Sequence, residues 1–308
     1  EPKSERDVPE GTVSRARAKC LCCGAVLPPE RVRAQLAAQC GGADVIFHHR
    51  DTESTEGTKK GSVSSVSPWC RTGGARMLAV VTLRPGETGR HYRLPTERDY
   101  QAVWKAQQRL RALLAEWEQG GRQGLCPVPD EPLPPIGTLG FRVQRYGMLQ
   151  WGDLFTARQK LALVTLSRLV RELTTETQRA RRDSLKEAVR LGMALVVNRM
   201  ADGNSSLSSW LSSREEVKHA FARQALPIVW DFAEVDLKSE ATRSWSGSLD
   251  WVAGVIEAWP ASPQGRVQLA DATEHPLPDD AAKVWFTDPP YYDAVPYADL
   301  SDFFFVWL

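Results

Sequence analysis

The feature that most restricts the fold of this chain is an apolar segment that runs directly into a stiff, proline-containing loop. Residues 283–287 (KVWFT) precede the loop 288–292 (DPPYY), and an amphipathic segment begins near Tyr297. Consecutive prolines fix their own backbone angles and hold the preceding residue in an extended conformation. A strand, a rigid loop and a helix in this order form the βα half of an α/β sheet. In open α/β sheets, function gathers at the carboxyl ends of strands, where this loop would lie.

The loop offers many hydrogen-bond acceptors and few donors. Neither Pro289 nor Pro290 has a backbone N–H, while the Asp288 carboxylate accepts hydrogen bonds. Tyr291 and Tyr292 place aromatic rings beside these acceptors. The exocyclic amine of adenine or cytosine suits such a surface, and a base in a duplex must be flipped out of the stack to reach it. The alternative interpretation is an ordinary turn stiffened by proline.

A second short strand is expected upstream, over residues 265–271, and it ends in a carboxylate. At the carboxyl end of a strand, Asp271 would face a bound cofactor. Capping of the turn that follows is an equally good interpretation of Asp271.

The cysteines point to reduced thiols or a metal site. The chain has six cysteines and no charged-then-apolar leader, which argues against a disulfide scaffold. Cys20 and Cys23, followed by Gly24, form a C-x-x-C-G knuckle in which two thiolates would bind one zinc ion. Zinc takes four ligands, and a second C-x-x-C is absent from the chain. The further candidate ligands are Cys22, Cys40, Cys70, His48 and His49. The alternative is a set of surface cysteines that bind no metal.

Positive charge concentrates in the front part of the chain. Residues 1–125 carry 20 Lys and Arg against 14 Asp and Glu, whereas the remainder carries 19 against 24. A basic front suits a polyanionic partner, although so small an excess is also typical of a solvated surface. Five cations near the knuckle are expected to contact phosphates: Arg15, Arg17, Lys19, Arg31 and Arg33.

Apolar residues at helical spacing predict most of the other elements. Helices are expected at residues 29–38, 96–119, 156–179, 184–200, 215–221, 249–259 and from 297 onward. Thr96 is expected to cap the second of these helices. A strand at 77–83 is expected to pair with residues 91–94 across the turn at 84–86. The tryptophans expected in the core are Trp210, Trp230, Trp245, Trp251 and Trp259.

Composition shifts divide the chain into four expected regions. They are a basic, zinc-ribbon-like region at 1–95 with a disordered insertion at 39–74, a helix and Pro-rich linker or extended wrap at 96–140, a helical region at 141–260, and a βα segment at 261–308. No apolar run approaches the roughly 18 residues of a membrane helix, so we expect a cytoplasmic protein that has no membrane partner. The chain begins with Glu1 and ends in the apolar run 303–308, which we interpret as the ends of a fragment.

The string 286–293 (FTDPPYYD) resembles the catalytic loop of amino-group DNA methyltransferases. Together with the strings 149–159 (LQWGDLFTARQ) and 229–234 (VWDFAE), the longer string 284–308 resembles adenine-specific DNA methylases that contain a zinc ribbon, a family associated with anti-phage loci. The resemblance implies a partial Rossmann-like α/β sheet with a zinc-ribbon-like and a helical insertion. It also implies a nucleoid-associated enzyme with double-stranded DNA as partner, with defence-system proteins as further partners.

By this resemblance, Asp288, Pro289, Pro290 and Tyr291 would act on the adenine amine, with S-adenosylmethionine as methyl donor and zinc at Cys20 and Cys23. The family's glycine-rich cofactor loop has no counterpart in this chain, so we expect the chain to be inactive by itself. A different class of function is a zinc-dependent nucleic-acid-binding module with an inactive methyltransferase remnant. A third is methylation of RNA or of a protein amide.

Overall fold

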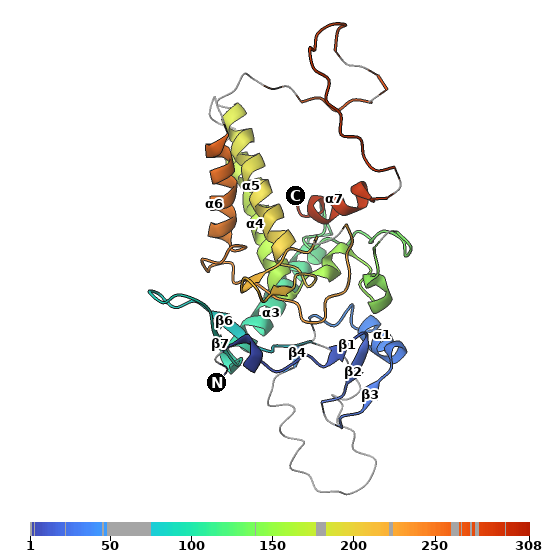
Figure 1. The fold of residues 1–308 in the computed structure, drawn as a ribbon, viewed down its shortest axis with the longest axis vertical. Helices are drawn as coiled ribbons and strands as arrows, with labels where there is room; N and C mark the ends of the chain where they lie inside the picture. Colours follow the sequence, from blue (N-terminus) through green and yellow to red (C-terminus); the bar gives the residue numbers. More distant parts are fainter. Residues whose placement is uncertain are drawn as a thin grey trace, which may run out of the picture.

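The computed structural model describes residues 2, 4–21, 23–44, 46–47, 75–138, 140–176, 183–221, 224–259, 265, 267–271, 273–274, 277–292 and 294–308. Its α-helices are α1 (Pro29–Ala37), α3 (Glu97–Gln119), α4 (Ala157–Glu176), α5 (Asp183–Gly203), α6 (Trp245–Ala258) and α7 (Tyr297–Phe305). Three short 3-10 helices accompany them: η1 (Glu5–Asp7), η3 (Val143–Tyr146) and η4 (Trp151–Leu154). Helices α3, α4, α5 and α6 contact one another in chain order and form the helical body of the molecule (Figure 1).

Local hydrogen bonds mark the start of two helices, α3 and α6. Thr96 lies at the N-cap of α3, and its N–H and Oγ1–H donate to the Asp99 carboxylate over 2.6 and 2.7 Å. The predicted cap is therefore confirmed. The Ser244 hydroxyl caps α6 by accepting from the Gly247 N–H, so this helix begins four residues before the predicted start at Leu249.

The described strands are short and form four small sheets. β1 (Val13–Ser14), β2 (Arg17–Lys19) and β3 (Val26–Leu27) form an antiparallel sheet, and β4 (Ile46–Phe47) pairs with β5 (Ala75–Arg76) in parallel. β6 (Val80–Thr82) pairs with β7 (His91–Arg93), and β8 (Trp210–Leu211) with β9 (Glu216–Val217), both antiparallel. The pairing of Val81 with Tyr92 confirms the predicted hairpin.

The helix predicted at residues 215–221 is wrong. Val217 pairs with Trp210 and Glu216 pairs with Leu211, so the first part of the segment is strand β9. Glu215 has φ of 50°, a left-handed conformation that does not continue a right-handed helix. Cross-strand pairing with a distant segment thus overrides the local helical spacing.

The main hydrophobic core lies where η3, η4, α4, α5 and α7 meet. Val143 and Leu154 are fully buried there, together with Phe303 of α7. The Phe155 ring lies 5.3 Å from Phe303 and 4.9 Å from Trp307, measured between ring centroids. Phe303 and Trp307 of the terminal apolar run are therefore packed into the core, whereas Phe305 and Leu308 remain exposed.

The tryptophan prediction is only partly correct. Trp210, Trp230 and Trp245 are half-buried. Trp251 and Trp259, in contrast, are 56% and 73% exposed on the outer side and end of α6. Trp251 is instead covered by the Arg199 guanidinium, whose carbon lies 4.2 Å from the ring centroid.

The Pro-rich segment 120–140 is an extended wrap rather than a free linker. Leu133 is buried in the main core, and its N–H donates to the Leu149 carbonyl over 2.8 Å. The Trp151 N–H donates to the Glu131 carbonyl over 3.1 Å. The segment therefore lies along η4.

The predicted α/β class is confirmed only in the sense that the described residues form both helices and small sheets. The strands expected at 265–271 and 283–287 are not formed by the described residues of either segment. Strand geometry requires a neighbouring chain to pair its N–H and C=O groups, and none of the described strands lies beside them. No helix in the described part of the chain is long and apolar enough to span a bilayer.

Candidate functional site

The loop 288–292 lies on an open arm of the molecule. The described parts of residues 265–292 leave the helical body and return to it at α7 (Figure 1). Tyr291 and Tyr292 are 68% and 103% exposed. The Asp288 carboxylate is exposed and makes no hydrogen bond or ion pair with the described residues. The acceptors predicted from the sequence are thus accessible to a ligand.

Helix α7 holds the end of this loop. The Tyr291 N–H donates to the hydroxyl of Tyr297, the first residue of α7, over 3.5 Å. Six residues further on, Phe303 is fully buried against Phe155 and Phe221. The proline pair restricts the backbone of the loop, and α7, which Phe303 anchors in the core, follows the end of the loop.

Asp271 caps a turn. Its Oδ1 accepts from the Thr273 N–H over 2.8 Å and from the Thr273 Oγ1–H over 2.7 Å. These hydrogen bonds, the backbone one first, hold the pKa of Asp271 below its usual value. The structure therefore shows the predicted cap of the turn, and contact of Asp271 with a cofactor stays a prediction.

Cys20 and Cys23 lie on the turn between β2 and β3. The Cys20 N–H donates to the Ala25 carbonyl over 2.8 Å, and the Gly24 N–H donates to the Cys20 carbonyl over 2.9 Å. Gly24 has φ of +70°, which residues with a Cβ adopt at a cost. The C-x-x-C-G sequence thus forms a tight turn with Cys23 exposed and Cys20 half-buried.

The described residues do not complete a zinc site. Two thiolates are half of a tetrahedral set, and no group of three or more His, Cys, Asp or Glu side chains gathers among the residues described. Cys40 is exposed elsewhere, after α1. Several other candidate ligands lie outside the described residues: Cys22, His48, His49 and Cys70. Most of the expected disordered insertion, 48–74, lies outside them as well.

Three of the five cations predicted to contact phosphates lie on the exposed β1–β2 hairpin. Arg15 and Ala16 form the two-residue turn between β1 and β2, with φ of 47° and 62°. Both angles are positive, as in the hairpin turn that normally selects Asn and Gly. Arg17 and Lys19 follow at alternate positions of β2, and both are exposed. The tight turn therefore presents Arg15 at the tip of a basic ribbon.

The other two predicted cations lie on α1 and differ in exposure. Arg31 is exposed, whereas Arg33 is half-buried and its Nε has no hydrogen-bond partner among the described residues. Helix α1 contacts β2, so Arg31 and the ribbon belong to one structural unit.

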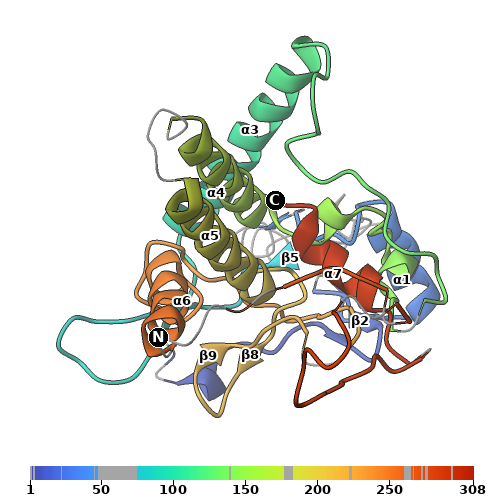
Figure 2. The same ribbon diagram turned by 90° about the horizontal axis from the view of Figure 1, so that it is seen from above.

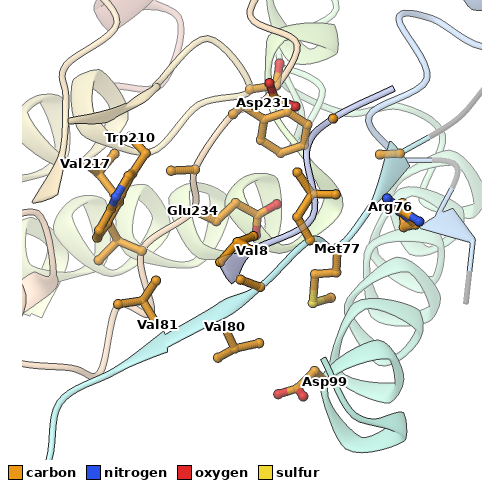
Figure 3. Close-up of a pocket in the computed structure, with 18 of the residues that line it drawn as sticks. Val8, Arg76, Met77, Val80, Val81, Asp99, Trp210, Val217, Asp231 and Glu234 are labelled. Atoms are coloured by element: carbon orange, nitrogen blue, oxygen red, sulfur yellow. The ribbon is translucent and has the colours of Figure 1, made fainter. Parts of the chain in front are cut away.

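A large groove lies away from the loop 288–292. Its volume is about 2010 Å³, and Asp288 is not among the residues that line it. Figure 3 shows Val80 and Val81 of β6 and Trp210 of β8 on its walls, with Asp231 at one end. Burial raises the pKa of the Asp231 carboxyl. Local sequence patterns do not predict this groove, because its walls come from segments far apart in the chain.

Two segments quoted for their resemblance to the methylases, 149–159 and 229–234, contribute residues to the groove. Arg158, in the first turn of α4, forms an ion pair with Glu234 over 2.6 Å. Behind it, the buried Gln159 side chain donates to Asn204 over 3.2 Å, and Asn204 accepts from the Val235 N–H over 3.1 Å. The strings 149–159 and 229–234 are thus parts of one polar contact at the base of the groove.

The described residues offer no binding loop for S-adenosylmethionine. None of the described strands runs through a glycine-rich loop into a helix. β3 is followed by Pro28 and α1, and β7 by Leu94, Pro95 and Thr96 before α3. The residues in hand therefore do not fit this cofactor.

Comparisons of the chain with protein-family models, with curated proteins and with solved structures found no match.

Proposed function

We propose that this chain carries the target-base loop and part of the DNA-contacting surface of a DNA methyltransferase that acts on the exocyclic amine of adenine. The observation that carries the proposal is the loop 288–292: a proline-stiffened, acceptor-rich segment whose carboxylate and tyrosine rings are exposed. Its end is fixed by α7, whose Phe303 is fully buried.

The chemistry follows from the hydrogen-bonding capacity of the loop. The lone pair of an exocyclic amine is delocalised into the base, so the nitrogen is a weak nucleophile. The Asp288 carboxylate and the Pro289 carbonyl would accept its two hydrogens and favour a more tetrahedral nitrogen. Tyr291 would stack on the flipped base, which is worth about 1 to 3 kcal/mol in comparable sites. These roles concern only residues that would contact the target base, and no residue is assigned to the methyl donor.

The finer fold is part of the same proposal. We infer that the segments 267–271 and 283–287 become strands of a Rossmann-like sheet when they pair with further strands. Val267, Leu269, Val284 and Phe286 lie at alternate positions and are exposed by 80% or more, as expected of strand faces that lack their cover. Pairing would also satisfy the backbone groups of these segments.

The test is made in the full-length protein. Asp288→Ala should reduce transfer of a methyl group to adenine, followed by mass spectrometry of digested DNA, by at least about 100-fold, as expected when a group that acts in the transition state is lost. Asp279→Ala, which removes another exposed carboxylate of the same arm, serves as the matched control and should retain activity. Methylation that persists in Asp288→Ala would refute the assignment.

A second candidate function rests on the β1–β2 ribbon and its knuckle. Arg17 and Lys19 lead directly into Cys20, so a metal bound there would stabilise a basic surface. A full-length protein that binds DNA, loses that binding on chelation of zinc and methylates no base would favour a nucleic-acid-binding module.

A further inference from the structure

Helix α3 carries four exposed basic side chains between residues 98 and 111. The buried residues of α3 are Tyr100, Val103, Ala106 and Leu110, and α3 packs against α4. At 100° per residue, the exposed cations Arg98, Lys105 and Arg109 lie on the opposite side of the helix. Arg111 is also exposed but lies at the border of the buried face, and Arg98 also lines the groove. Between residues 100 and 115 the helix contains no acidic residue.

These cations are largely unpaired. Arg98, Lys105 and Arg111 form no ion pair with the described residues. Arg109 lies 3.1 Å from Glu116, but both side chains are more than half exposed, and such surface pairs contribute little. The face therefore keeps a net positive charge that the structure itself does not neutralise.

The arrangement does not serve the stability of the helix. Lys105 and Arg109 are four residues apart, a spacing at which like charges destabilise a helix by about 0.2 to 0.5 kcal/mol. Arg98 lies in the first turn, where the helix dipole disfavours a cation. A charge pattern that weakens its own helix is better explained by a partner than by folding.

The neighbouring side chains suit a nucleic acid. Gln101 and Gln108 lie on the same exposed face, and the Trp104 ring is 40% exposed beside them. Amides bind phosphate and sugar oxygens, and an exposed aromatic ring contacts the sugars or an unstacked base. Thirteen residues separate Arg98 from Arg111, which corresponds to about 20 Å of helix. Over about that length a DNA duplex carries about 12 phosphate charges.

The helix is also accessible. Figure 2 shows that the C-terminal end of α3 projects beyond α4 and α5. The N-terminal half is held in place by Gln107, whose side chain donates to the Asp44 carbonyl. A projecting but anchored helix presents its cations at fixed positions.

We infer that the exposed face of α3 binds the sugar–phosphate backbone of double-stranded DNA, as a second contact surface beside the β1–β2 ribbon. This inference rests on the proposed function and extends it. The recognition is electrostatic and independent of base sequence, because phosphates carry no sequence information.

The experiment measures how DNA affinity depends on salt in the full-length protein. The probe is a fluorescently labelled duplex of mixed sequence, and the variant is Arg98→Gln/Lys105→Gln/Arg111→Gln. Glutamine is a good helix former, so α3 should persist, and circular dichroism checks this. Each lost phosphate contact should lower the slope of log Kobs against log salt by about 0.9, which makes about 2.7 for three.

The matched control removes the same charge from other surfaces, as Arg168→Gln/Arg190→Gln/Lys238→Gln. This variant should keep a slope close to that of the wild type. Equal loss in both variants would show a general charge effect and overturn the inference about α3. An unchanged slope in a folded α3 variant would overturn it as well.

A third variant separates this inference from the proposed function. If Arg15→Gln/Arg17→Gln/Lys19→Gln lowers the slope and the α3 variant does not, DNA binding by the ribbon stands and the α3 surface is refuted. If the wild-type protein shows no salt-dependent binding to DNA, both the α3 surface and the DNA-methyltransferase proposal fail.

Discussion

The aromatic core around α7 and the open arm 265–292 are both rich in large apolar residues, yet they have opposite environments. Phe303 is fully buried, whereas Phe286, seventeen residues earlier in the chain, is 91% exposed. Phe303 contacts rings from η4, from the segment after β9 and from α7 itself. Burial stabilises apolar side chains, but their presence in a segment does not ensure that they are buried. Burial also requires packing partners, and these come from distant segments of the chain.

The largest expected effect comes from removing a ring of the packed region. Phe303→Ala should lower the free energy of unfolding by about 3 to 5 kcal/mol, because it leaves a cavity among Phe155, Trp151 and Phe221. Urea denaturation followed by circular dichroism measures the change. A loss below about 1 kcal/mol would mean that the core collapses onto the cavity, and would break the contrast with the arm.

An intermediate effect is expected at a polar anchor of the helical body. Hydrogen bonds and charge from Arg93, with further bonds from Thr96, hold the pKa of Asp99 well below its usual range. Replacement by Asn should lower the free energy of unfolding at neutral pH by about 1 kcal/mol, the typical contribution of a helix cap.

The pH dependence of Asp99 has a definite sign. Its pKa is lower in the folded state, so its stabilising contribution is complete above the unfolded pKa of about 3.9 and disappears as the pH falls toward the lower folded value. The gap in stability between wild type and Asp99→Asn should therefore shrink below about pH 4. A gap that stays constant down to pH 2 would contradict the role assigned to the carboxylate.

The smallest effect is expected on the arm. Phe286→Ala should change the free energy of unfolding of this chain by less than about 0.5 kcal/mol, because the ring is almost fully exposed. The same urea titration measures it beside Phe303→Ala. A loss of more than about 1 kcal/mol would show that the arm packs against another part of the molecule in solution, and the contrast between the two regions would fail.

Local patterns predicted the helices well and the strands poorly. The apolar spacing along α3, α4 and α5 placed these helices close to their observed bounds, and Thr96 was identified as a cap. The segment 215–221 shows the opposite outcome, since pairing of Val217 with Trp210 made its first residues a strand. The groove was not predicted, because its Arg158–Glu234 ion pair joins residues 76 positions apart.

The sequence by itself determined most of the helices, because each helical hydrogen bond joins residues only four positions apart. It also determined the chemistry of the loop 288–292, since the missing N–H groups of Pro289 and Pro290 follow from the residue type alone. Only the tertiary structure decided which apolar surfaces are covered, which cations of α3 stay unpaired, and that Arg158 pairs with Glu234 at the groove. Burial, ion pairing and strand formation each require a second segment of the chain. Local sequence patterns do not indicate which segment that is or how far along the chain it lies.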